Sequence, residues 1–167
     1  MTTDTASLRA TSQARAFAII AAALFLNNTV ALMLGPLLVD IANEFDTSVA
    51  VAGQLAAATF LSWAIFAPLI GPFSDSLGRR LVALTGLGVM GVCISSAAFA
   101  PNFIVLMFLL IGTGLGGSMI PPNSMAAISD VVSPEKRGRA IGVAQGIMAS
   151  AVVVGVPVVA VLTSVAD

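Results

Sequence analysis

The sequence predicts an all-α integral membrane protein with five transmembrane helices and a cytoplasmic N-terminus. Three observations lead to this fold class. Hydrophobic residues make up 58% of the 167 residues, charged residues make up only 9%, and the few charges separate long charge-free runs. A soluble domain carries roughly 25% charged residues because its surface faces water. A chain with so few charges is suited to lipid instead.

The charge-free runs place the helices. Three of them are long enough for the roughly 20 helical residues that cross a bilayer once, and the run 81–129 is long enough for two crossings. Pro101-Asn102 near its middle predicts the turn between these two. We therefore predict helices at 16–39, 48–70, 81–100, 103–126 and 140–162. Residues 1–15 form a cytoplasmic tail and 16–167 the membrane domain. Open β-structure is disfavoured because its edges would be unsatisfied in lipid.

The basic residues predict the orientation, because all 7 fall on one side of this five-helix path. They are Arg9, Arg15, Arg79, Arg80, Lys136, Arg137 and Arg139. The opposite side has the acidic residues Asp40, Glu44, Asp46 and Asp167 and no basic residue. The positive-inside rule assigns the basic side to the cytoplasm. A signal peptide is an alternative interpretation of the first run, but that run is long for such a segment and lacks a clear small-x-small cleavage site.

Composition also excludes several classes of function. A net charge of −1 argues against nucleic-acid binding, which needs a basic face. The sequence contains no His, and Cys93 is its only cysteine, so neither an intramolecular disulfide nor a cysteine or histidine metal site is expected. Catalytic triads that depend on His are excluded as well. We expect no enzyme activity, no metal and no cofactor.

Two glycine-rich segments match a dinucleotide-binding fingerprint, GLGVMG at 86–91 and GTGLGG at 112–117. A functional phosphate loop needs a preceding strand and a helix that starts at the glycines. Both segments lie inside predicted apolar helices. We interpret them as small residues that let helix backbones approach closely. Pro121-Pro122 predicts a distortion of the fourth helix, since two backbone donors are missing there.

A few amide side chains lie within the predicted spans: Asn27, Asn28, Gln54, Asn123 and Gln145. An amide in hydrocarbon is costly unless it is paired or faces water. Each of these side chains therefore either forms an interhelical hydrogen bond or lines a polar cavity. Both interpretations stay open for Asn27 and Asn28, and a hydrogen bond is favoured for Gln54. No acidic residue lies deep within a span, so a proton or cation carrier is not evident.

The segment GPFSDSLGRR at 71–80 follows the second predicted helix. Gly71 and Gly78 allow a tight turn. Asp75 and Arg79 are close enough to pair, and Arg80 anchors the loop at the level of the lipid phosphates. Anchoring alone explains the arginines, but it does not explain an aspartate flanked by glycines at this spacing.

This segment resembles the major facilitator superfamily signature Gly-x-x-x-Asp-Arg-x-Gly-Arg-Arg. Gly71, Asp75, Gly78, Arg79 and Arg80 match it, and Ser76 stands where the family usually has Arg. The resemblance implies a gating loop that forms a charge relay with the neighbouring half. The cytoplasmic segment around Arg137, Gly138 and Arg139 is similar to the family's loop before the fifth helix. Gly155-Val156-Pro157 is similar to a shortened antiporter motif.

The resemblance implies the N-terminal part of an efflux-type transporter that moves a drug or sugar-like solute by alternating access. Such transporters usually have twelve helices in two halves. The expected partners are the lipid bilayer, a small-molecule substrate and the missing C-terminal half or another subunit. The alternative is a truncated, non-transporting membrane protein or subunit. By analogy with the family, Asn27, Asn28, Met119 and Asn123 are candidate cavity residues, and Gly155 and Pro157 are expected to contact the other half.

Overall fold

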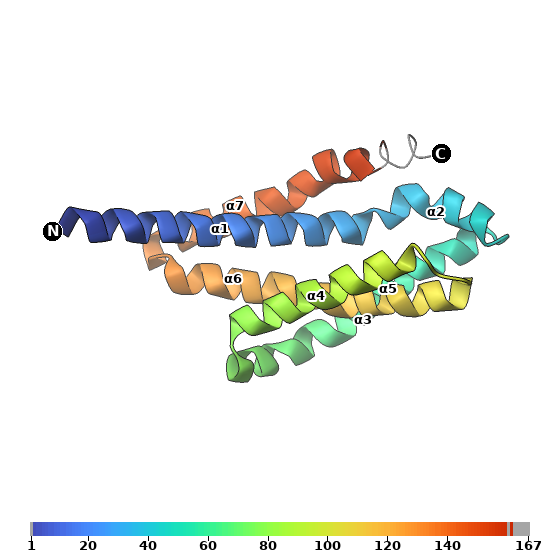
Figure 1. The fold of residues 1–167 in the computed structure, drawn as a ribbon, viewed down its shortest axis with the longest axis horizontal. Coiled ribbons are helices and arrows are strands. Elements are labelled where there is room, and N and C mark those ends of the chain that lie inside the picture. Colours follow the sequence, from blue (N-terminus) through green and yellow to red (C-terminus); the bar gives the residue numbers. More distant parts are fainter. Residues whose placement is uncertain (1, 160, 162–167) are drawn as a thin grey trace.

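The computed structural model describes residues 2–159 and 161, and the side chains of 15–130, 132–159 and 161. Its elements are α1 (Thr2–Leu32), α2 (Leu34–Glu44), α3 (Val49–Leu77), α4 (Arg79–Ala97), α5 (Phe103–Ser118), α6 (Ile120–Val131), α7 (Pro134–Ser150) and a π-helical turn, η1 (Ala151–Gly155). They lie side by side along the long axis of the molecule (Figure 1).

Five stretches of the described residues are long and apolar enough to cross a membrane: Arg15–Leu32, Val49–Leu77, Arg79–Ala97, Phe103–Asp130 and Pro134–Val159. The predicted all-helical fold with five membrane helices is confirmed.

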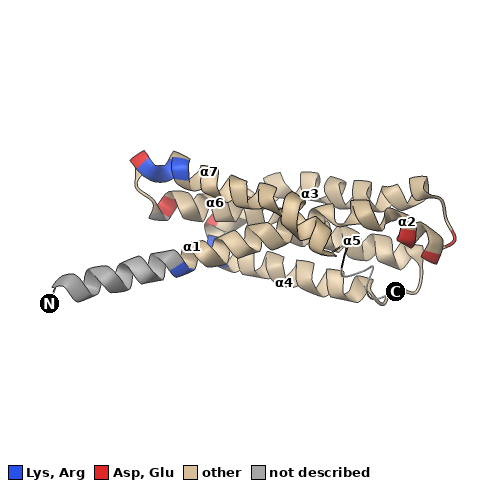
Figure 2. Ribbon diagram, turned by 90° about the horizontal axis from the view of Figure 1, so that it is seen from above, with Lys and Arg blue, Asp and Glu red and all other residues tan. Residues whose placement is uncertain are grey.

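The described charges lie at the two ends of the bundle and not between them (Figure 2). Arg15, Arg79 and Lys136 lie at the end where α4 and α7 begin. Asp40, Glu44 and Asp46 lie at the opposite end, in α2 and the turn after it. Five crossings that start at the basic end place these two groups of charges at opposite ends, as the structure does. The assignment of the basic end to the cytoplasm rests on the positive-inside rule and stays a prediction.

Prolines lie at three of the places where a helix breaks or changes its hydrogen bonding, whereas Pro68 and Pro72 lie inside α3. A proline has no N–H, and its ring clashes with the carbonyl four residues earlier. Accordingly α1 ends four residues before Pro36, and α5 ends four residues before Pro122. Pro157 follows η1, in which the Val156 N–H bonds to the Ala151 carbonyl, five residues back. The distortion predicted from Pro121-Pro122 is confirmed.

Several helix boundaries differ from the predicted ones. The first predicted helix, 16–39, is two helices, and α1 includes residues 2–15 of the predicted tail. Helix α3 continues past 70 to Leu77 because Gly71 and Pro72 are accommodated inside it, as transmembrane helices often allow. The last predicted helix begins at Pro134 and not at 140, since proline is well suited to the first turn. Its predicted end at 162 lies outside the described residues.

The interior consists of two apolar clusters, one toward each end. The cluster toward the basic end joins α1, α4, α6 and α7 through Leu24, Met90, Ile120, Ile128 and Ala144. The cluster toward the acidic end joins α2, α3 and α5 through Leu34, Leu55, Leu106 and Leu110.

Glycines bring the backbones of neighbouring helices into contact. A Cβ on Gly116 of α5 would lie 2.6 Å from both the Gly86 carbonyl oxygen and the Met90 nitrogen of α4. A Cβ on Gly114 would meet the Thr59 carbonyl of α3. Both segments that match the dinucleotide fingerprint are helical, and the interpretation as packing residues is confirmed for the glycines at close contacts: Gly86, Gly112, Gly114, Gly116 and Gly117. Gly88 and Gly91 have open space around them instead.

Replacing Gly116 with Ala is expected to destabilise the bundle. The added methyl group meets backbone atoms of α4 that cannot rotate away, so we expect a cost of about 1–3 kcal/mol. In detergent, thermal unfolding followed by Trp63 fluorescence should show a midpoint lower by about 5 °C. The matched variant is Gly88→Ala in α4, where the added group meets nothing within 4 Å beyond its chain neighbours and the adjacent backbone of its own helix. Equal midpoints for the two variants would contradict the packing at Gly116.

Single cysteines test the orientation. In a Cys93→Ser background, Ser76→Cys places a thiol at the basic end and Ala98→Cys places one at the opposite end, and both positions are exposed. In intact cells, a membrane-impermeant maleimide is expected to label the cysteine at 98 and to leave that at 76 unlabelled until the membrane is permeabilised. The reverse pattern would show that the basic end is extracellular.

Candidate functional site

One arginine joins three helices at the basic end of the bundle. Arg79, at the start of α4, lies 3.8 Å from the Asp75 carboxylate in the last turns of α3. It also donates a hydrogen bond to Asp130 near the end of α6, with which it forms an ion pair. We refer to Arg79, Asp75 and Asp130 together as the Arg79 clasp. The predicted pairing of Asp75 with Arg79 is confirmed.

The Arg79 clasp lies in contact with solvent. The Arg79 side chain is 36% exposed, and the Asp130 carboxylate is 63% exposed. Ion pairs of this kind contribute about 0–1 kcal/mol each, because water screens them and holding two side chains in place costs entropy. The clasp therefore contributes little to the stability of the bundle, and its ion pairs can break at small cost.

Asp130 was not among the candidates drawn from the sequence. The pattern did contain a signal for it, because Asp130 ends the charge-free run 81–129. That run makes two crossings, so Asp130 lies at the same end as Arg80, which precedes the run. A carboxylate at that position is a potential partner for the arginines of 71–80.

The turn before α4 is shorter than predicted. Gly78 alone separates α3 from α4, and its φ of 92° is rarely adopted by residues with a side chain. Gly71 is not part of the turn but lies inside α3, with an exposed surface. Arg80 is exposed and forms no ion pair with any described residue. Ser76, in place of the family's arginine, donates to the Phe73 carbonyl at 3.0 Å.

A buried polar contact lies beneath the Arg79 clasp. The Ser74 hydroxyl of α3 donates to the Asn123 amide oxygen of α6, and both residues are 4% exposed. The Asn123 amide nitrogen donates to the Met119 carbonyl at 2.7 Å, at the break between α5 and α6. Asn123 thus uses both ends of its amide to link α3 with this break. Met119 itself packs its Cβ against Gly86 of α4.

The two asparagines of α1 point to different neighbours. Asn28 donates to the Met148 carbonyl of α7 at 2.6 Å, which supports the hydrogen-bonding interpretation for this residue. Asn27 is 3% exposed, and its amide oxygen lies against Gly117 of α5. It borders a small cavity of about 20 Å³ that Trp63 also lines. The assignment of Asn27, Asn28, Met119 and Asn123 to a substrate cavity stays a prediction.

The prediction of an interhelical hydrogen bond for Gln54 is wrong for the described residues. Its side chain is exposed and bonds to no described residue, because it lies on the outer surface of α3 near its start. The residues Arg137, Gly138 and Arg139 do not form a loop, since all three lie in the first turns of α7. Arg137 donates from Nε to the Val132 carbonyl at 3.3 Å.

Gly155 and Pro157 lie at the end of the last described span. Gly155 is buried, and a Cβ there would collide with the Thr29 side chain of α1. Pro157 is exposed. Gly155 therefore packs inside the bundle, and the expected contact of this segment with a second half stays a prediction.

Comparison with known proteins gives a family match along most of the chain. The model described as Major Facilitator Superfamily matches residues 18–167. The uncharacterized MFS-type transporter YceJ of Bacillus subtilis is 29% identical over 135 residues, which are 81% of this chain and 35% of that protein. Quinolone resistance protein NorA of Staphylococcus aureus is 31% identical over 103 residues, 62% of this chain and 26% of NorA. Multi-drug resistance efflux pump PmrA of Streptococcus pneumoniae is 32% identical over 91 residues, 54% of this chain and 23% of PmrA. The chain spans about a third or less of the length of these relatives.

Replacing Asn123 with Ala is expected to weaken the contact between α3 and α6. The Ser74 hydroxyl then loses its acceptor in a buried position, which costs about 1–3 kcal/mol in general and about 0.6–1.7 kcal/mol in measured membrane proteins. SDS-induced unfolding should show a loss of about 1–2 kcal/mol.

A double-mutant cycle separates the hydrogen bond from other effects of the substitution. Ser74→Ala should cost much less in the Asn123→Ala background than in the unmodified protein, because the bond is already absent. The matched control is Ser76→Ala, two residues along α3 at an exposed position, and it should be close to neutral. Additive costs for Ser74→Ala and Asn123→Ala would contradict a bond between them.

Proposed function

Because the chain belongs to the major facilitator superfamily, we propose that it is part of a transporter that exports a small molecule by alternating access. It is a multi-pass protein of the cell membrane, with five spanning helices among the described residues. Two of the relatives, NorA and PmrA, are named for quinolone resistance and multi-drug efflux. Their names support outward transport of a drug-like compound as the activity to test.

The observation that carries the proposal is the Arg79 clasp. Helices α3 and α4 come from the first three membrane spans, and α6 ends the fourth span. Each half of a superfamily transporter contains two such three-helix units, and alternating access arises when one bundle rocks against the other. The clasp joins the two units through side chains that are 36% to 73% exposed, so water can replace either partner.

A switch between two conformations needs contacts whose free energies differ by only a few kcal/mol. The glycine contacts of α5 with α3 and α4 are too close to slide without loss of packing. The exposed ion pairs of Arg79 can break without a loss of packing. We therefore assign the opening and closing of the basic end to the clasp, and the rigid framework to the glycine contacts.

The experiment is expression of the full-length protein in a bacterial host that lacks its main efflux pumps. We expect a higher inhibitory concentration of a quinolone and faster efflux of a cationic dye than in cells with an empty vector. Arg79→Gln removes both ion pairs and should reduce the efflux rate at least tenfold. Arg79→Lys should retain part of the activity, because a single ammonium group keeps the charge but not the planar guanidinium that pairs with two carboxylates.

The matched control is Asp40→Asn, which removes an exposed charge at the opposite end of the bundle. It should leave efflux unchanged when immunoblots show equal protein amounts. Unchanged efflux in the Arg79→Gln variant would contradict the role of the clasp. No export of any compound by the unmodified protein would favour the alternative of a non-transporting membrane protein.

A further inference from the structure

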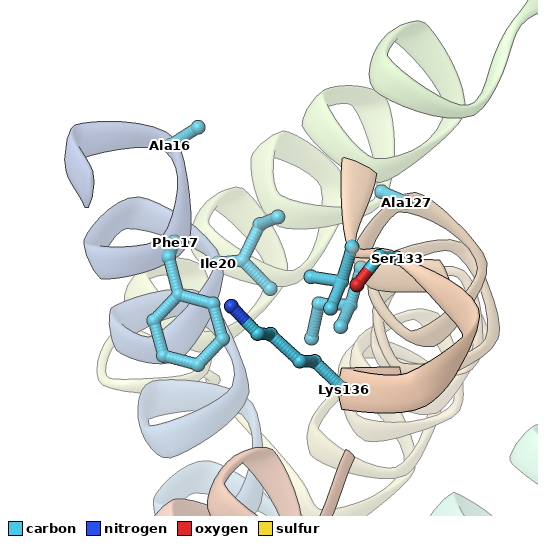
Figure 3. Close-up of a pocket in the computed structure, with 8 residues that line it drawn as sticks. Ala16, Phe17, Ile20, Ala127, Ser133 and Lys136 are labelled. Atoms are coloured by element: carbon cyan, nitrogen blue, oxygen red, sulfur yellow. The ribbon is translucent and has the colours of Figure 1, made fainter. Parts of the chain in front are cut away.

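An apolar groove lies at the basic end of the bundle, between α1, α6 and the start of α7. It has a volume of about 360 Å³, within the usual range for small-ligand sites. Its wall includes Phe17 and Ile20 of α1, Ile128 of α6, and Val132. Ser133 and Lys136 supply the polar groups. Figure 3 shows Lys136 extending across this groove toward Phe17 and Ile20. We refer to it as the interfacial groove.

The groove lies at the edge of the membrane-spanning region. The first spanning stretch begins at Arg15, next to the groove, and the fifth begins at Pro134. We therefore expect the apolar side chains at the depth of the lipid acyl chains and Lys136 near the depth of the head groups. A lysine at such a position places its methylene groups in the apolar zone and its ammonium among the phosphates.

The charge of the groove is not neutralised by the described protein. Two of the carboxylates at this end, Asp75 and Asp130, both pair with Arg79. Glu135 is exposed in the first turn of α7 and forms no ion pair with a described residue, and the same is true of Lys136. An anion is therefore the complementary ligand for Lys136.

We propose that the interfacial groove binds an anionic phospholipid of the cytoplasmic leaflet. One acyl chain lies along Phe17, Ile20 and Ile128, and the phosphate contacts the Lys136 ammonium and the Ser133 hydroxyl. A soluble anion would leave the apolar wall unused, whereas a lipid satisfies both the wall and the cation. Basic pockets between transmembrane helices on the cytoplasmic side suit lipids of this charge. The proposal does not depend on which solute is exported.

The test uses a tryptophan in the groove and lipids that quench it. Trp63 is the only tryptophan, so Phe17→Trp in a Trp63→Phe background reports on the groove alone. The 167-residue protein is placed in nanodiscs that contain brominated phosphatidylglycerol or brominated phosphatidylcholine, each mixed with the unbrominated form of the other. The ratio of quenching gives the preference of the groove for the anionic lipid. We expect about a fivefold preference, the effect of one lysine near an anionic surface.

Lys136→Gln should reduce this preference to less than twofold. The matched control is Arg139→Gln, one turn further along α7, which is exposed and does not line the groove. It should retain the preference. Ile20→Trp provides a second reporter on the same wall, so the result does not depend on one substitution.

Three outcomes would overturn the proposal. Equal quenching by the two lipids in the unmodified background excludes selectivity for the anion. An equal loss of preference in Lys136→Gln and Arg139→Gln indicates diffuse attraction to the whole basic end. Absence of quenching by either lipid indicates that protein covers the groove.

Discussion

The bundle depends on the close contact of α5 with α3 and α4. In lipid, helices gain little from burying apolar surface, because the acyl chains are as apolar as the side chains that they replace. Association then rests on backbone proximity and on interhelical hydrogen bonds. Gly114 and Gly116 supply that proximity. They position the break after Ser118, and so they also position Asn123 against Ser74 of α3 and Asp130 against Arg79 of α4.

The sequence predicted the number of helices, their order and the separation of charges, because crossing a bilayer imposes a length and a composition that a single sequence displays. It also predicted the Asp75–Arg79 pair, which is local. Contacts between segments that lie far apart in the sequence were harder to predict. Asp130 lies 51 residues from Arg79, and no periodicity connects them. The end of α3 was also predicted too early, since Gly71 and Pro72 usually terminate a helix in water but are tolerated in a membrane bundle.

Two kinds of contact therefore meet at the basic end. The Ser74–Asn123 hydrogen bond is buried, and breaking it leaves polar groups without partners in a dry environment. The Arg79 clasp, within one or two turns of it, is hydrated. A movement that opens the end of the bundle is less costly if it separates Arg79 from Asp130 and keeps Ser74 against Asn123.

The π-helical turn at Ala151–Gly155 has a consequence for the comparison of related chains. A π-turn contains one more residue than the α-helical turn that it replaces, and each residue of an α-helix rotates the chain by about 100°. A relative with one residue fewer at this point could form an uninterrupted α-helix of almost the same length. Its residues beyond the turn would keep their depth in the membrane but face a different neighbour. An alignment by hydropathy alone would pair side chains that do not occupy equivalent positions after Gly155.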